Sequence, residues 1–214
     1  MTILVACEHS GRIRDALTKR GFDAVSCDLK ISDTPGKHYV GDVREILFEA
    51  NWDAVIAHPP FTHTAVSGNR WFKEKIADGR QQQGIDFFLM FTKLKCPFAI
   101  EHPVSIMSTK YRKPDQIIQP YQFGHPTTKK TCLWLQELPL LVPTDVVEPE
   151  WYLNPDGTSY RDLKGKRYPR WHMKTGGGLK NSAELRSITY QGIADAMADQ
   201  WGDYLRGRRG YDKK

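Results

Sequence analysis

The chain has 214 residues, enough for one sizeable core, and its hydrophobic content of 40% and aromatic content of 11% are typical of an ordered globular protein. It holds no apolar run near the roughly 18 residues that a membrane-spanning helix needs, and the opening stretch MTILVACEHSG lacks the basic leader of a secretory signal. We therefore expect a soluble cytoplasmic protein with no membrane partner.

Apolar, β-rich runs alternate along the chain with segments of helical spacing. Strands are expected at residues 2–7, 23–29, 38–43, 52–57, 97–103 and 131–136, and helices at residues 10–20, 80–95 and 189–205. Such alternation predicts one α/β domain, residues 1–214, with a mainly parallel sheet and helices on both faces.

Two segments interrupt this rhythm and carry most of the formal net charge of +6. Residues 137–180 are rich in Pro, Gly and charge, and we interpret them as a loop-rich basic insertion, with seven Lys or Arg against one acid in residues 161–180. Residues 206–214, with five basic residues against one acid, are predicted to be a basic flexible tail. Basic segments that also contain Tyr and Trp favour a nucleic-acid partner, with Arg167 and Arg170 as contacts; a solvated loop and tail is the alternative.

The four cysteines, Cys7, Cys27, Cys96 and Cys132, form no CxxC pair. We interpret them as buried free thiols rather than metal ligands, and no metal is expected, because the histidines show no close ligand spacing either.

Four polar features follow directly after predicted strands, where ligands bind in open α/β sheets. They are the turn Cys7–Gly11, Asp28, the corner His58–Phe61, and Glu101. Glu8 and Asp28 are twenty residues apart, the spacing at which an acid after a strand-turn-helix holds a ribose diol. The turn lacks GxGxxG, so a nucleoside-type ligand without phosphates fits better, and S-adenosylmethionine is the common one.

The corner His58-Pro59-Pro60-Phe61 is unusual at the end of a core strand. The two prolines have no N–H group, so they cannot continue a ladder and their carbonyls stay available. An aromatic ring beside those carbonyls can stack on a flat base. The alternative is a plain turn in which Phe61 packs into the core.

Several motifs, in order, resemble those of cytosine carbon-5 DNA methyltransferases, in the short form found in phage and prophage genomes. They are LVACEHSG for the cofactor loop, Asp28 for the ribose acid, GDV (41–43) for the acid near the adenine, HPPFTHTAVSGNRW for the catalytic loop, EHPV (101–104), QFGHPTTKKT (122–131), and RSITYQGIADAMADQW for the closing helix. The resemblance runs almost end to end, although the large target-recognition domain of typical members is missing. It implies a Rossmann-like S-adenosylmethionine-dependent methyltransferase fold in a phage- or prophage-encoded protein of a bacterial cell. It also implies cofactor contacts from Cys7, Glu8, His9, Gly11, Asp28 and Asp42.

The sequence departs from that family at its centre, because Phe61 stands where the family has its nucleophilic cysteine, and an arene cannot be that nucleophile. The loop instead resembles the Asn/Asp/Ser-Pro-Pro-Phe/Tyr motif of amino-methylating DNA enzymes, with His58 at the polar position. We therefore assign His58, Pro59, Pro60, Phe61 and Glu101 as catalytic. Glu101 retains the family's carboxylate that contacts the base; an exposed strand-end acid is the alternative. Nucleic-acid contacts are expected from Arg70, Lys129, Lys130, Arg167 and Arg170.

Together these features favour an enzyme, an S-adenosylmethionine-dependent methyltransferase that acts on a nucleobase, cytosine by resemblance, in DNA without the usual cysteine. Two alternatives stay open: a methyltransferase acting on a free nucleotide, and an inactive relative that binds nucleic acid or a partner protein. The methylated atom, the target sequence and the oligomeric state are left open by the sequence.

Overall fold

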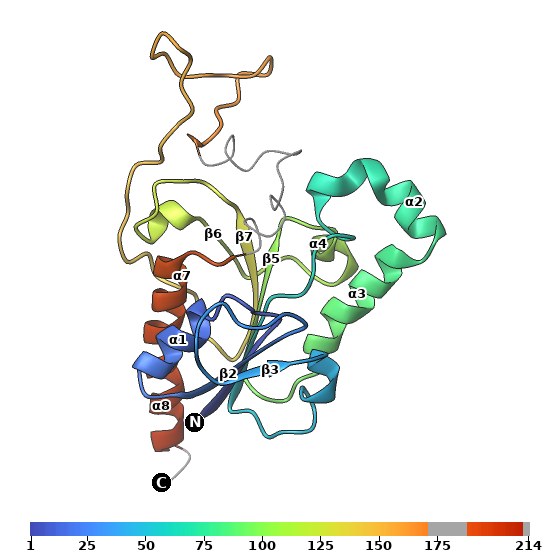
Figure 1. Cartoon of the computed structure of the whole chain (residues 1–214), viewed down its shortest axis with the longest axis vertical. Helices are drawn as coiled ribbons and strands as arrows, with labels where there is room; N and C mark the ends of the chain where they lie inside the picture. The colour runs from blue at the N-terminus through green and yellow to red at the C-terminus, as the bar shows by residue number, and fades with distance from the viewer. Residues whose placement is uncertain (171–187, 212–214) are drawn as a thin grey trace.

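The computed structural model describes residues 1–170 and 188–211 (Figure 1). Its strands are β1 (Thr2–Ala6), β2 (Asp23–Asp28), β3 (His38–Val40), β4 (Ala54–Ala57), β5 (Phe98–Pro103), β6 (Gln116–Ile118) and β7 (Thr131–Gln136). Its α-helices are α1 (Arg12–Lys19), α2 (Phe72–Ala77), α3 (Arg80–Phe91), α4 (Met107–Lys110), α7 (Gln191–Ala196) and α8 (Gly202–Tyr211). Short 3-10 segments lie at Val43–Glu45, Val66–Trp71 and Pro120–Gln122, and a π-helical turn, Met197–Trp201, joins α7 to α8.

The seven strands form one sheet in the order β3-β2-β1-β4-β5-β7-β6. The first five strands in this order are parallel to one another, whereas β7 runs antiparallel to both β5 and β6. The leading order 3-2-1-4-5 is that of a doubly wound Rossmann-like sheet. The predicted mainly parallel α/β fold is therefore confirmed.

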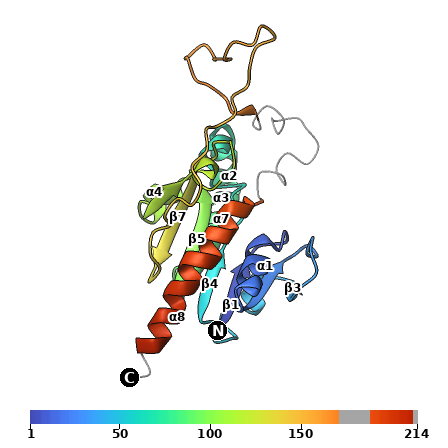
Figure 2. The ribbon, with the colours of Figure 1, turned by 90° about the vertical axis from the view of Figure 1, so that its left-hand side faces the viewer.

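The core lies on both faces of this sheet because alternate strand residues point to opposite sides. In β1, Ile3 and Val5 pack with α1, α7 and α8, while Leu4 and Ala6 pack on the other side with α3 and α4. Figure 2 shows α1, α7 and α8 together along one face. This burial on two faces explains why the central strands read as nearly continuous apolar runs.

The closing helix differs from its predicted extent of 189–205. It begins at Gln191, passes through the π-helical turn, and continues to Tyr211, so residues 206–211 of the predicted tail are helical. Trp201 anchors it: the ring is 1% exposed and its Nε1–H donates to the carbonyl of Pro139 at 2.9 Å. Residues 212–214 lie outside the described residues.

The described part of the predicted insertion, residues 137–170, contains none of the named helices or strands. Its first part packs on the domain, where Leu141 is 2% exposed in the core. Residues 150–170 form an arm in which isolated bridges join Trp151 to Pro169, Leu153 to Ser159 and Arg161 to Arg167. Figures 1 and 2 show this arm projecting beyond the sheet on the side where the parallel strands end. Residues 171–180 of the insertion lie outside the described residues.

Across residues 1–170 and 188–211, no helix combines the length and the apolar character needed to cross a membrane.

Candidate functional site

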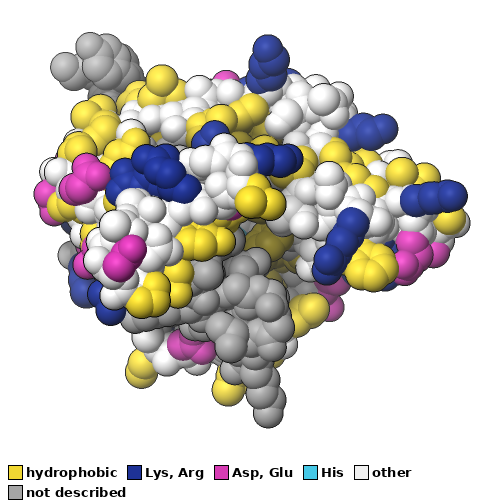
Figure 3. All heavy atoms as spheres, turned by 90° about the horizontal axis from the view of Figure 1, so that it is seen from above, with side chains coloured by type: hydrophobic (Ala, Val, Ile, Leu, Met, Phe, Trp, Pro, Cys, Tyr) yellow, Lys and Arg dark blue, Asp and Glu magenta, His cyan; other side chains and the backbone are white. Residues whose placement is uncertain are grey.

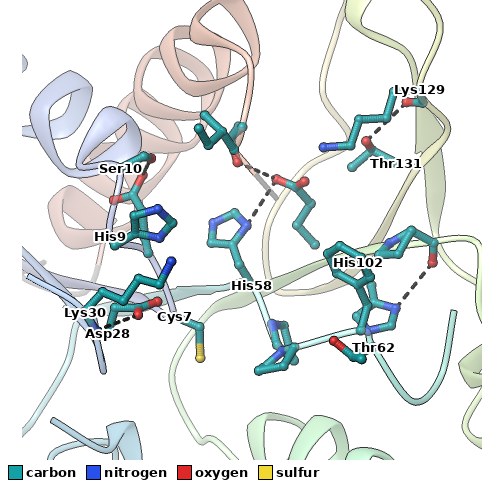
Figure 4. Close-up of a pocket in the computed structure, with 18 of the residues that line it drawn as sticks. Cys7, His9, Ser10, Asp28, Lys30, His58, Thr62, His102, Lys129 and Thr131 are labelled. Atoms are coloured by element: carbon teal, nitrogen blue, oxygen red, sulfur yellow. Dashed lines mark hydrogen bonds and ion pairs between the residues drawn. The ribbon is translucent and has the colours of Figure 1, made fainter. Parts of the chain in front are cut away.

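A cavity of about 620 Å³ opens where β1, β2, β4 and β5 end and β7 begins (Figure 4). Most of the residues that the sequence singled out meet there. Its lining consists of Cys7, Glu8, His9, Ser10, Asp28, Lys30, His58, Pro59, Pro60, Phe61, Thr62, Ser67, Glu101, His102, Pro103, Thr128, Lys129, Thr131, Ile188 and Thr189. In Figure 4, His58 lies in the middle, between His9 and Ser10 on one side and Lys129 on the other.

The turn after β1 is tightly built. Cys7 has a φ of 60° and Gly11 a φ of 70°, both in the left-handed region that favours glycine. A Cβ added at Gly11 would lie 2.2 Å from Oγ1 of Thr34 and 2.5 Å from the guanidinium of Arg14. Gly11 therefore shapes the turn into α1, although it does not itself line the cavity.

Glu8 is turned toward the start of α1 and is 5% exposed. Its carboxylate accepts hydrogen bonds from the backbone N–H groups of Ile13 at 2.8 Å and Arg14 at 3.3 Å, and from the Ser10 hydroxyl at 3.4 Å. Burial raises the pKa of Glu8. Because these N–H groups are already satisfied, the helix N-terminus does not offer the donors that a phosphate would need.

The two other predicted cofactor acids lie in different places. Asp28 ends β2 and lines the cavity, where its Oδ1 accepts from the backbone N–H of Lys30 at 3.0 Å. Asp42 lies outside the cavity lining: it accepts from the backbone N–H of Arg44 at 2.9 Å and pairs with the Arg44 guanidinium. These bonds to Arg44 lower the pKa of Asp42. His9 lines the cavity with its Nε2 3.9 Å from Asp33.

His58 and Glu101 form the central pair of the site. Nδ1 of His58 lies 3.2 Å from Oε2 of Glu101, and both side chains are about one-tenth exposed, at 12% and 10%. The Thr189 hydroxyl donates to the same oxygen at 3.2 Å. Nε2 of His58 is shielded from solvent and has no hydrogen-bond partner among the described residues.

Electrostatics favour the ionised form of this pair. Burial lowers the pKa of His58, but the Glu101 carboxylate outweighs burial and leaves that pKa raised. Burial likewise works to raise the pKa of Glu101, but His58, Lys129 and the Thr189 hydroxyl bring it below its usual value. Both shifts favour an imidazolium paired with a carboxylate, the form in which Nε2 of His58 carries a proton.

Phe61 is half-buried on the cavity wall, and its ring meets His102 edge-on, with centroids 6.1 Å apart and planes at 88°. His102 is held by the hydroxyls of Ser105 at 3.0 Å and Thr64 at 3.4 Å. Burial lowers the pKa of His102 to about 4, so this ring is neutral. Phe61 therefore faces the cavity with an aromatic support behind it, rather than being fully enclosed in the core.

The predicted basic residues divide by position. Lys129 lines the cavity, with its Nζ 5.8 Å from the centre of the Tyr190 ring, and burial lowers its pKa against the pull of Glu101. Lys130 and Arg70 are exposed and do not line the cavity. The guanidinium of Arg70 lies 5.1 Å from the ring centre of its neighbour Trp71.

Arg167 and Arg170 belong to the arm and lie outside the cavity lining. The Arg167 guanidinium lies 4.1 Å from the ring centre of Trp151, and its Nε donates to the Ser159 hydroxyl at 3.0 Å. Arg170 is 3.9 Å from the carboxylate of Glu150. Both arginines thus also have partners within the arm.

The four cysteines are free thiols, and Cys7 lines the cavity. Cys27 and Cys132 are buried, whereas Cys7 and Cys96 are partly exposed. Burial raises the pKa of the Cys7 thiol far above neutral, so it stays protonated and weakly nucleophilic. In the part of the chain that the structure describes, no three His, Cys, Asp or Glu residues are grouped so as to hold a metal ion.

Ser10 and His102 fall inside the motifs that the sequence singled out but were given no role there, and the lining residues Lys30 and Thr189 were missed. His102 carries the one available signal, since it lies beside Glu101 at the end of a strand. Thr189 reaches Glu101 from 88 positions away, and no local pattern marks it.

Comparisons with known proteins give little. No family model matches the chain, and no curated protein matches it. Among solved structures, the chain is similar to a candidate DNA modification methyltransferase encoded within a prophage of E. coli, with 16% identity and a TM-score of 0.46. The match covers 69% of this chain and 52% of that one, so the chain spans about half the length of that protein. A similarity this low carries no argument about function.

Proposed function

We propose that this protein is an S-adenosylmethionine-dependent methyltransferase that modifies a nucleobase in DNA without a covalent enzyme–base intermediate. The observation that carries the proposal is the wall formed by Phe61 and the His58–Glu101 pair, in the same cavity that Asp28 lines. One part of the cavity suits a nucleoside and the other a flat, hydrogen-bonding ring.

The cofactor part fits a nucleoside-type ligand that has no phosphates. Asp28 would hold the ribose hydroxyls, and the turn Cys7–Gly11 would border the rest of the molecule. Glu8 already occupies the N–H groups at the start of α1, which argues against a dinucleotide. S-adenosylmethionine, when bound, supplies an electrophilic methyl group. Its positive charge suits a site that contains the carboxylates of Asp28 and Glu8.

The base part offers a hydrogen-bond acceptor beside the aromatic wall of Phe61. The Glu101 carboxylate retains acceptor capacity beyond its bonds to His58 and Thr189, whereas Nε2 of His58 lies on the side of the ring away from Glu101 and is buried. The hydrogen-bonding edge of cytosine carries a complementary donor, its exocyclic amino group. Adenine carries the same donor, so nucleoside analysis must distinguish the two.

This arrangement favours the exocyclic amino nitrogen as the methyl acceptor. Phe61 would stack on the base and fix its plane, while Glu101 would orient the amino group. The amino nitrogen must lose a proton when its new bond to carbon forms, and the Glu101 carboxylate is placed to take that proton. Carbon-5 chemistry would instead need a thiolate at the position of Phe61, and Cys7 lies in the turn after β1 with a protonated thiol.

Mass spectrometry of nucleosides tests this function. DNA incubated with the protein and S-adenosylmethionine should yield a cytosine or adenine nucleoside methylated on its amino nitrogen. Phe61→Ala should lower the yield, since loss of base stacking costs roughly 1–3 kcal/mol. A product methylated on carbon 5 would overturn the proposed mechanism. Absence of any methylated nucleoside, despite cofactor binding, would favour an inactive relative.

A further inference from the structure

A second cavity of about 580 Å³, which we call the arm groove, lies where the arm leaves the domain. Its lining consists of Gln119, Tyr121, Thr128, Val146, Val147, Glu148, Pro149 and Trp151. Thr128 lines both this groove and the main cavity. The two spaces therefore border the same residue, Thr128.

Backbone hydrogen bonds fix the position of the groove. The N–H of Val147 donates to the carbonyl of Tyr121 at 2.9 Å, and the N–H of Glu150 donates to the carbonyl of Pro126 at 2.7 Å. The segment beneath the groove continues directly into Thr128 and Lys129, which line the main cavity. The groove is thus built on the same segment as the wall of the proposed active site.

The groove has an aromatic lining with basic residues around it. Tyr121 and Trp151 are half-buried, and the indole is fixed by the Arg167 guanidinium and by its Nε1–H, which lies 3.4 Å from Glu148. Lys130 is exposed two residues from Thr128. Residues 161–170 hold five basic residues, Arg161, Lys164, Lys166, Arg167 and Arg170, against the single acid Asp162. Figure 3, which views this end of the molecule, shows Lys and Arg side chains projecting among apolar ones.

We propose that the arm groove holds the nucleotide next to the target base, so that the substrate is a DNA strand rather than a free nucleotide. This inference rests on the proposed function of the main cavity. Flat aromatic surfaces accept any base by stacking, and nearby cations neutralise the strand's phosphates. A free nucleotide would occupy the main cavity alone and leave the groove unused.

The charge of Glu148 limits how the DNA strand can lie in the arm groove. Its carboxylate is directed at the indole N–H of Trp151 and would repel a phosphate placed inside the groove. The base of the flanking nucleotide therefore enters the groove, and its phosphates lie toward Lys129, Lys130 and the basic arm.

Binding of a fluorescent single-stranded oligonucleotide, followed by anisotropy, tests this inference without requiring methyl transfer. Trp151→Ala should weaken binding by about 5- to 150-fold, the range expected for loss of one stacked base. Val146→Glu should also weaken it, because Val146 is 68% exposed in the groove and the new charge would repel the strand without disturbing the core. Tyr152→Ala is the matched control: the ring is an exposed aromatic of the same arm but does not line the groove.

The outcomes separate this inference from the proposed function. Equal oligonucleotide affinity in wild type, Trp151→Ala and Val146→Glu would overturn the inference, as would a mononucleotide that competes as well as the oligonucleotide. If binding depends on Trp151 but no methylated nucleoside forms, the groove stands and the proposed function fails. If mononucleotide and DNA are methylated equally well in wild type and Trp151→Ala, the function stands and the inference fails.

Discussion

Nδ1 of His58 lies 3.2 Å from Oε2 of Glu101, and the opposite nitrogen of the same ring is buried without a partner among the described residues. The carboxylate therefore fixes both the orientation and the charge of the imidazole. Groups facing His58 from other elements act on it too: Glu8, from the turn after β1, raises its pKa, and Lys129, before β7, lowers it. Their opposition leaves Glu101 as the partner that decides the charge of His58.

Replacing Glu101 should reveal this pair in the pH dependence of stability. Because the pKa of His58 is raised on folding, its contribution to the free energy of unfolding is fully present below the unfolded-state pKa of about 6.5. That contribution is lost as pH rises through the pKa of the folded protein. Because the pKa of Glu101 is lowered on folding, its contribution to the free energy of unfolding is fully present above the unfolded-state pKa of about 4.3. That contribution is lost as pH falls through the pKa of the folded protein. Glu101→Gln should therefore lose most stability between about pH 4.3 and 6.5, by about 1.5–3 kcal/mol.

Thermal unfolding from pH 4 to 9 measures this effect. The control is Glu150→Gln, which removes an exposed ion pair with Arg170 and should change stability by less than about 1 kcal/mol. A difference between wild type and Glu101→Gln that stays constant across this pH range would show that the pair is not ionised.

Asp28 and Asp42 should differ in their effect on cofactor binding. Both are implied by the resemblance, but only Asp28 lines the cavity, while Asp42 is bonded to Arg44 outside it. Asp28→Ala should weaken binding of S-adenosylmethionine by roughly 10- to 150-fold, the value of hydrogen bonds to a charged acceptor. Asp42→Ala should have a much smaller effect.

Isothermal titration calorimetry with S-adenosylmethionine and its demethylated product provides the measurement. No heat from either ligand in the wild-type protein would contradict the methyltransferase proposal. An equal loss in the two variants would mean that the site extends past the lining of the cavity toward Asp42.

The sheet was predictable from the sequence because its central strands are buried on both faces and read as apolar runs. β6 and the helices α2 and α4 were not, since segments of three to six residues carry too little periodicity and are held by tertiary contacts. The closing helix was predicted too short, because its last turns are rich in Arg and Gly, which hides the helical pattern. Trp201 and Leu205 are the buried residues that mark the side of this helix packed against the core.

The candidate site was predictable where a residue follows a strand in the chain, as for Asp28, His58 and Glu101. It was not predictable where side chains decide the geometry. Asp42 was expected inside a strand at 38–43, but β3 ends at Val40, and Arg44, two residues further on, holds the Asp42 carboxylate outside the cavity. The arm groove depends on residues 144–150 running beside residues 121–126, and no spacing within either segment indicates that contact.

Covalent trapping should fail in this protein. An oligonucleotide with fluorine on carbon 5 of cytosine traps carbon-5 enzymes as an adduct that survives denaturation, because elimination is blocked. With Phe61 on the cavity wall and the Cys7 thiol protonated, we expect no such adduct by denaturing gel electrophoresis or intact mass. Should an adduct form, Cys7→Ser identifies its source: loss of the adduct in this variant would make Cys7 the nucleophile.

The salt dependence of DNA binding should distinguish the basic residues that meet phosphates from those that only hold the arm together. Each phosphate neutralised contributes about 0.9 to the slope of log affinity against log salt on duplex DNA. Lys130 is exposed close to both cavities, so Lys130→Gln should lower the slope by about one contact. Arg170→Gln should lower it less, because Arg170 has Glu150 as a partner, whereas Arg167→Gln should also disturb the packing of Trp151.

The measurement is anisotropy of labelled DNA across a salt series, with cofactor affinity as the check on folding. A slope that none of the three variants changes would mean that these side chains are only solvated and that the attraction to DNA arises elsewhere.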